Sequence, residues 1–200
     1  MSPLPLSFYR QKDVVKIAKQ LLGKTLISEI EGVKTGGIII ETEAYGGATD
    51  KACHAYKGKC SNRTKTMFHP GGIAYVYLCY GMHNLLNVVT NEKNTPEAVL
   101  IRAIYPQMGI DMMLKRRKKK KVSPILTSGP GSLCKALGIT RKHDQHTLLK
   151  SPLWIEKNDI LIREKDIEAS KRIGIDYAEE DANRLWRFRI TRQLIEALIS

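Results

Sequence analysis

The sequence IAYVYLCYGMHNLLNVVTNEKNTPEAVLIRAI, residues 73–104, contains three apolar segments rich in Val, Ile, Leu and Tyr, separated by turn residues. The turns are marked by Tyr80-Gly81 and by the polar stretch Asn91 to Pro96. Segments of this length and composition between such turns are typical of successive β-strands. We therefore predict three strands, at Ile73–Leu78, Leu85–Thr90 and Ala98–Ile104.

Outside this stretch the patterns indicate further strands and a few scattered helices. Helices are predicted at Asp13–Leu22, Gln107–Leu114 and Ser132–Leu137, and residues 46–72 form a loop rich in Gly, Asn, Ser and Lys. The other predicted strands are Thr25–Ile27, Gly36–Tyr45, Leu153–Glu156, Ile160–Arg163 and Leu185–Ile190. Strands with helices at irregular positions, no internal repeat and no long linker favour a single α+β domain over residues 1–200 rather than a doubly wound fold.

Composition excludes several classes of protein. The 200 residues are 42% hydrophobic and 26% charged, which is ordinary globular usage, and this length suffices to bury a core without disulfides or metals. No apolar run approaches the 18 residues of a membrane span, and the start MSPLPLSFYR lacks a secretory signal pattern. The four cysteines include no CxxC pair, so we expect a cytoplasmic protein with reduced thiols.

The positive charge is concentrated in the middle of the chain. Residues 51–150 hold 18 Lys and Arg against 4 Asp and Glu, whereas the two flanks together hold 15 against 16. Such a distribution is typical of a surface that binds a polyanion, although a solvated basic surface is the alternative. The run Lys115–Lys121 is predicted to be a mobile surface loop or a frayed helix end, because like charges repel within a helix.

Two carboxylates project from the predicted strand at residues 36–45. Alternation places Ile39, Glu41, Glu43 and Tyr45 on one face, and Ile38, Ile40, Thr42 and Ala44 on the face toward the core. The first face is either the wall of a site or a place for salt bridges. Arg102 lies in an otherwise apolar strand and must meet a carboxylate or a phosphate, so Glu43 or Glu41 is its natural partner.

Tyrosines gather in the same part of the sequence. Tyr75 and Tyr77 share one face of their predicted strand, and Tyr80 follows in an exposed turn beside Gly81. Such rings suit the stacking of a nucleobase, although tyrosine also packs ordinary half-buried sheet faces. The spacing of the Cys and His residues fits no common zinc pattern, and neither a G-x-S-x-G elbow nor a phosphate-binding Gly-rich loop occurs.

A set of short motifs follows in order along the chain. These are Glu41-Thr42-Glu43-Ala44-Tyr45, His54, Met67-Phe68, Tyr75-Val76-Tyr77, Tyr80-Gly81-Met82-His83, Asn87, Leu100-Ile101-Arg102-Ala103, Ser128-Gly129-Pro130, Leu133-Cys134 and Ala136-Leu137. Together they resemble the motifs of the alkyladenine (3-methyladenine) DNA glycosylase family in its compact bacterial form. The resemblance runs from about residue 6 to residue 190 and rests on the combination of motifs.

The resemblance implies a single α+β domain with a curved antiparallel β-sheet flanked by helices, and no cofactor or metal. The implied partner is double-stranded DNA that contains a damaged purine, acted on by a monomer associated with the nucleoid and not with a membrane. The implied reaction flips the purine out of the stack and hydrolyses its N-glycosidic bond. No catalytic lysine is implied, so we expect a monofunctional enzyme that does not cleave the strand.

The resemblance also implies roles for individual residues. Glu43 matches the catalytic base, and Arg102 the arginine that helps to hold the water and a nearby phosphate. The flipped base is implied to lie among Tyr45, His54 and Tyr77, with His54 also placed to donate a hydrogen bond to the purine edge. Asn87 is implied to crowd the 2-amino group of guanine. The remaining implied roles are DNA intercalation for Tyr80 and Met82, DNA backbone contacts for Arg63, Lys65 and His83, and the water site for the backbone of Ile173 and Gly174.

Two features depart from the family pattern. The run Lys115–Lys121 is unusually basic, and Cys60-Ser61-Asn62-Arg63-Thr64 replaces the more usual Thr-Pro-Arg segment. A rival interpretation is a basic nucleic-acid-binding protein without catalysis, such as an RNA- or ribosome-associated domain. It explains the charge and the tyrosines equally well, but it assigns no role to the combination of Glu43, His54, Asn87 and Arg102.

Overall fold

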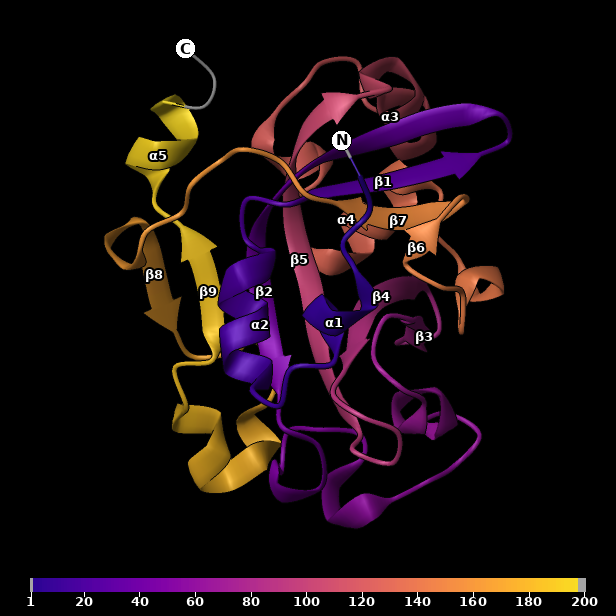
Figure 1. Ribbon diagram of the computed structural model, residues 1–200. Coiled ribbons are helices and arrows are strands. Elements are labelled where there is room, and N and C mark those ends of the chain that lie inside the picture. Colours follow the sequence, from indigo (N-terminus) through magenta and orange to yellow (C-terminus); the bar gives the residue numbers. More distant parts are fainter. Residues whose placement is uncertain (1, 198–200) are drawn as a thin grey trace.

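A computed structural model describes residues 2–197 (Figure 1). Its strands form one curved, antiparallel sheet in the order β3-β4-β5-β2-β1-β7-β6, with β9 also paired to β2, and β8 paired to β9. The strands are β1 (Thr25–Ile30), β2 (Val33–Tyr45), β3 (Ala74–Cys79), β4 (His83–Thr90), β5 (Glu97–Met108), β6 (Leu149–Lys150), β7 (Leu153–Glu156), β8 (Ile167–Ser170) and β9 (Arg187–Ile190). The predicted α+β fold with a curved antiparallel sheet is confirmed; the domain bounds 1–200 stay a prediction.

Helices pack on this sheet and complete the main core. The α-helices are α1 (Leu6–Tyr9), α2 (Val14–Leu21), α3 (Ile110–Arg117), α4 (Pro130–Leu137) and α5 (Arg192–Ala197). Short 3-10 turns lie at Gly47–Thr49, Tyr56–Gly58, Lys65–Phe68, Pro124–Leu126, Arg141–His143, Glu164–Asp166 and Asp176–Asn183. Helix α2 begins after Asp13, whose side chain accepts a hydrogen bond from the Lys16 N–H, and it lies against β2 (Figure 1).

Most predicted elements are confirmed with small shifts of their ends. The prediction of a helix from Gln107 is wrong at its start, because β5 continues to Met108 and Gly109 turns the chain at a φ of 67°. A Cβ atom on Gly109 would lie 2.2 Å from the Lys34 carbonyl oxygen, so glycine is required there. Helix α3 therefore begins at Ile110.

The predicted strand Ile160–Arg163 is absent from the described residues, which form a loop there. The Ile160 N–H donates to the side chain of Asn158 instead of to a neighbouring strand, and Asn158 also donates to Thr25 Oγ1. The apolar residues of this segment belong to a loop that packs Ile162 on the main core. The strand predicted from Leu185 begins two residues later, at Arg187.

Alternation along β2 is broken in the structure. Glu41 pairs with Ala103 and Thr42 with Ile101, whereas Ile39 pairs with Ile104, so Ile40 is an extra residue on β2. Ile39 therefore lies in the main core, and its predicted place on the same face as Glu41 and Glu43 is wrong. A bulge of this kind reverses the side-chain alternation beyond it.

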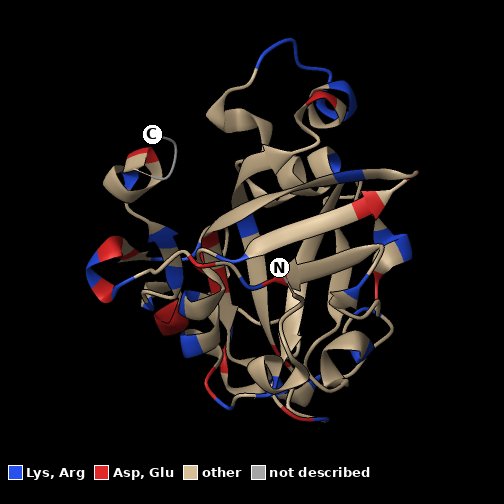
Figure 2. Ribbon diagram, turned by 45° about the horizontal axis from the view of Figure 1, so that its top comes forward, with Lys and Arg blue, Asp and Glu red and all other residues tan. Residues whose placement is uncertain are grey.

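The basic run after Met113 divides into two parts. Lys115, Arg116 and Arg117 form the last turn of α3, and Lys118 ends the helix at a φ of 53°. The Arg116 guanidinium donates to the carbonyls of Ile30 and Ala136, so this arginine is a structural residue. Residues 118–121 form an exposed loop that projects from the body of the protein (Figure 2).

Candidate active site

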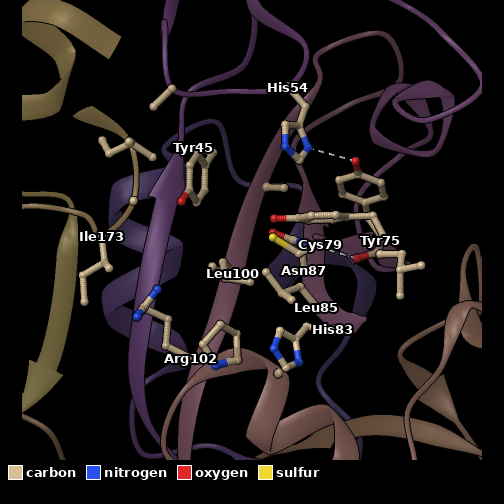
Figure 3. A pocket seen from close by; sticks show the side chains of 18 of the residues that line it. Tyr45, His54, Tyr75, Cys79, His83, Leu85, Asn87, Leu100, Arg102 and Ile173 are labelled. Carbon is tan, nitrogen blue, oxygen red and sulfur yellow. Dashed lines mark hydrogen bonds between the residues drawn. The ribbon is translucent and has the colours of Figure 1, made fainter. Parts of the chain in front are cut away.

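A cavity of about 630 Å³ opens between the β3–β4 hairpin, the loop after β2, the start of α4 and the segment after β8 (Figure 3). Most of the residues predicted for the site line this cavity: Tyr45, His54, Arg63, Tyr77, Tyr80, His83, Asn87, Arg102, Ile173 and Gly174. Met82 and Lys65 lie outside the lining. Glu43 is fully buried and lies behind the wall, in contact with three lining residues.

The Glu43 carboxylate accepts two hydrogen bonds and forms one ion pair. Its Oε2 accepts from the Tyr45 hydroxyl at 2.8 Å, and its Oε1 accepts from the Ile173 backbone N–H at 2.9 Å. Arg102 Nη1 lies 3.2 Å from the same Oε1. These donors hold the orientation of a carboxylate that has no exposed surface. The structure thus brings together Glu43, Tyr45, Arg102 and Ile173.

A second bulge positions Arg102. Ala103 pairs with Glu41 and Ile101 with Thr42, so Arg102 is the extra residue on β5 at this point. Its Nε donates to Glu41 Oε1 at 2.9 Å, while its Nη1 reaches Glu43. The expectation that Arg102 pairs with Glu41 or Glu43 is therefore confirmed, and both carboxylates are partners. Bulges next to sites commonly redirect a side chain in this way.

Glu41 has a different environment from Glu43, although both lie on β2. Its Oε1 also accepts from Arg187 on β9 at 2.8 Å, so two arginines converge on this one oxygen. Glu41 thus ties β5 and β9 to β2. The salt-bridge interpretation applies to Glu41, and Glu43 is the carboxylate next to the aromatic cavity.

Aromatic rings form the upper part of the cavity (Figure 3). The His54 and Tyr77 rings pack edge to face, with their centroids 4.7 Å apart. The Tyr75 ring stacks on the Tyr77 ring, with a centroid distance of 5.4 Å. His54 Nδ1 lies 3.0 Å from the Tyr75 hydroxyl. Tyr45 stands on the opposite side of the space, where burial and the Glu43 carboxylate raise the pKa of its hydroxyl well above the usual value. The cavity is open between these rings.

His54 is held as an uncharged imidazole. Burial, together with the charge of Arg63, lowers the pKa of His54 to about 4. The Arg63 guanidinium lies 3.1 Å from His54 Nε2, and because a guanidinium has no acceptor, this contact assigns the lone pair to Nε2 and the hydrogen to Nδ1. Both ring nitrogens of His54 are thus engaged, and neither is a free donor toward the cavity.

Asn87 lies on β4, in the cavity wall below the rings (Figure 3). Its side-chain nitrogen donates to the backbone carbonyl of Tyr75 at 3.2 Å, and the residue is only 5% exposed. This bond holds the amide plane in one orientation. A rigid polar group in such a position limits which ring substituents a ligand can carry.

The β3–β4 turn presents two apolar side chains to solvent. Tyr80 is 85% exposed and Met82 is 70% exposed, and Tyr80 and Gly81 both have positive φ, at 49° and 70°. The Met82 N–H donates to the Cys79 carbonyl and closes the turn. A bulky residue in the left-handed region costs about 1–2 kcal/mol, so an exposed tyrosine held there points to a functional role.

An ion pair that the sequence did not indicate supports the cavity from behind. Arg172 makes two hydrogen bonds to Asp50, and both side chains are fully buried. The Arg172 guanidinium also lies 4.9 Å from the centre of the Tyr45 ring and 5.2 Å from that of Trp186. Because Ile173 follows Arg172 directly, this pair fixes the backbone N–H that reaches Glu43. Its members are 122 residues apart, and no local pattern could have found them.

Within residues 2–197 no group of three or more His, Cys, Asp or Glu side chains could hold a metal ion. In the same range no helix is long and apolar enough to cross a membrane.

Comparison with known proteins identifies the family of the chain. A family model described as Methylpurine-DNA glycosylase (MPG) matches residues 7–194. The chain belongs to this family. It is therefore a hydrolytic DNA glycosylase with a role in base excision repair, and its substrate is DNA.

Individual relatives agree with the family match. Three proteins named "Putative 3-methyladenine DNA glycosylase" are similar to this glycosylase over nearly their whole length. The protein from Chlamydia felis is 50% identical over 92% of this chain and 94% of its own. The protein from Clostridium novyi is 46% identical over 95% of this chain and 96% of its own. The protein from Bacillus cereus is 46% identical over 92% of this chain and 93% of its own.

Proposed function

We propose that this glycosylase removes alkylated or deaminated purines from duplex DNA, of the class that includes 3-methyladenine, 7-methylguanine, hypoxanthine and ethenoadenine. The purine is flipped into the aromatic cavity, a water molecule activated by Glu43 hydrolyses its N-glycosidic bond, and an abasic site remains without strand cleavage. The observation that carries this proposal is the fully buried Glu43 carboxylate behind the cavity wall, with three donors on its two oxygens.

Charge development explains why one carboxylate suffices. As the bond between C1′ and the purine breaks, the sugar gains oxocarbenium character, which a nearby carboxylate stabilises. The same carboxylate accepts a proton from the attacking water. Tyr45, Arg102 and the Ile173 N–H hold Glu43 in place, and Arg102 also provides positive charge for a phosphate beside the flipped nucleotide.

The aromatic cavity and the exposed turn account for base extrusion. Unstacking a base costs a few kcal/mol, and stacking on an aromatic ring returns about 1–3 kcal/mol. Tyr45, His54 and Tyr77 supply these rings around the cavity, and Asn87 disfavours normal guanine. Tyr80, with Met82 beside it, enters the space that the flipped base leaves.

Basic residues near the cavity are proposed to hold the DNA backbone. His83 lies at the base of the inserting turn, and Lys65 is exposed on the loop after β2. The cavity is complete within one chain, so we propose that a monomer acts on the DNA in the cytoplasm, in association with the nucleoid. A basic nucleic-acid-binding protein without catalysis would have no use for the Glu43 arrangement.

The direct test is base release from duplexes with a single lesion of each kind. We expect the protein to convert a 7-methylguanine or hypoxanthine duplex into one that breaks on heating with alkali, and to leave an intact strand without that treatment. Breaks before alkali would contradict a monofunctional enzyme. An absence of alkali-sensitive breaks on every lesion would contradict the proposed function.

Replacement of Tyr80 tests the intercalating role. We expect Tyr80→Ala to weaken binding to a lesion duplex by about 10- to 100-fold, because the side chain no longer fills the gap in the stack. Binding to undamaged duplex, which depends on phosphate contacts and on salt, should change little. Gel-shift titrations of both duplexes measure the difference, and Tyr80→Phe is the matched control that keeps the ring. Equal losses on both duplexes would contradict intercalation.

A further inference from the structure

Arg63 lies at the cavity rather than away from it. The resemblance implied a contact to the DNA backbone, but the guanidinium lines the cavity, 3.1 Å from His54 Nε2 and 5.0 Å from the centre of the Tyr77 ring. An ordered turn holds it there. Thr64 is buried and its hydroxyl accepts from the Ser61 N–H and donates to the Lys59 carbonyl. None of the ion pairs found among residues 2–197 includes Arg63.

Arg63 is also the positive charge of the aromatic part of the cavity. Among the described lining residues, arginine occurs at Arg63 and Arg102 and lysine at none. Arg102 is bonded to Glu41 and Glu43, at the opposite end of the site from His54. His54, beside Arg63, stays uncharged at neutral pH. A purine stacked near Tyr77 would therefore meet one cation, the Arg63 guanidinium.

We propose that Arg63 binds the edge of the flipped purine and stabilises the leaving group of neutral lesions. This inference rests on the proposed function. A guanidinium presents two parallel N–H groups, which match the O6 and N7 acceptors of a hypoxanthine ring. To make this contact the guanidinium moves from His54 Nε2 to the ring edge, and it remains over Tyr77.

The charge of the departing purine decides which lesions Arg63 helps to remove. When the C1′–N9 bond of a neutral purine breaks, its electron pair stays on N9, and the negative charge spreads over the ring toward O6 and N7. Water oxygen forms the new bond to C1′ and passes a proton to Glu43, and solvent then protonates the departing purine anion. Arg63 keeps its own protons throughout. A cationic purine such as 7-methylguanine leaves as a neutral ring, so Arg63 has no developing negative charge to stabilise.

The test compares two lesions at the same position of the same duplex. We expect Arg63→Met to slow single-turnover excision of hypoxanthine by about 10- to 100-fold, the loss for a charge-assisted hydrogen bond, and to slow excision of 7-methylguanine much less. Arg63→Lys, which keeps the charge without the fork, should give an intermediate hypoxanthine rate. Lys65→Met is the matched control, expected to slow both lesions together and to reduce the salt dependence of binding.

The outcomes separate this inference from the function on which it rests. Equal slowing of both lesions by Arg63→Met would make Arg63 a backbone contact and overturn the inference. The inference would also fall if the wild-type protein released 7-methylguanine but no hypoxanthine. In both cases release of 7-methylguanine would still support the proposed function. Release of neither lesion by the wild-type protein would contradict both the proposed function and the inference about Arg63.

Discussion

Glu43→Gln is expected to reduce single-turnover base release by about 10²- to 10⁴-fold, the contribution typical of a general base, while lesion binding is retained. Glutamine has nearly the shape of glutamate, and its carbonyl oxygen can still accept from a neighbouring donor. It can neither take a proton from water nor offset positive charge on the sugar. Rapid-quench measurements of abasic-site formation with excess enzyme give the rate, and gel shifts give the binding.

Glu41→Gln is the matched control for this experiment, because Glu41 lies two residues away on the same strand and also contacts Arg102. Its role in the structure is to join Arg102 and Arg187, so this variant should lose more stability than chemistry. Thermal unfolding of both variants separates the two effects. A Glu43→Gln protein that excised lesions near the wild-type rate would rule out Glu43 as the base.

Asp50→Asn is expected to lower the free energy of unfolding by about 3–5 kcal/mol, because it leaves the buried Arg172 guanidinium without its countercharge. Excision should fall as well, because Arg172 packs on Tyr45 and precedes Ile173. Urea denaturation at neutral pH measures the stability. The excision rate is measured well below the midpoint of unfolding, so that only folded protein contributes.

Two further variants serve as controls for Asp50→Asn. Breaking the exposed pair between Arg189 and Glu168 with Arg189→Met should cost at most about 1 kcal/mol, since both side chains are about half exposed. Replacing both partners, as Asp50→Leu with Arg172→Met, should recover part of the stability lost by Asp50→Asn. If Asp50→Asn were no more harmful than Arg189→Met, the buried pair would not be holding the cavity wall.

Much of the fold could be predicted because it depends on local patterns. The apolar spacing after Asp13 and the strand Leu153–Glu156 need only neighbouring residues to be recognised, and both are confirmed. Predictions failed where a local pattern met a tertiary requirement. Gly109 must turn the chain close to the Lys34 carbonyl. The Ile160 N–H donates to the Asn158 side chain and is therefore not available to pair with a neighbouring strand.

The candidate site shows the same division. Glu43, Tyr45, Tyr77 and Arg102 were recognisable because strands carry them in short motifs, and the cavity brings Tyr45, Tyr77 and Arg102 together with Glu43 directly behind its wall. Alternation along β2 predicted one face for Ile39, Glu41 and Glu43, whereas the structure gives these three residues different environments. The difference arises from two bulges and from the pairing of β9 with β2, which depend on the neighbouring strands.

The sequence by itself determined the class of fold, the basic middle of the chain and the residue types of the site, because these follow from composition, spacing and motif order. The tertiary structure alone decided that Glu41 joins Arg102 to Arg187, that Arg63 turns toward His54, and that Asp50 pairs with Arg172. Each of these is a contact between groups far apart in the chain. Its energy depends on distance, burial and charge in the folded protein, and no local pattern contains that information.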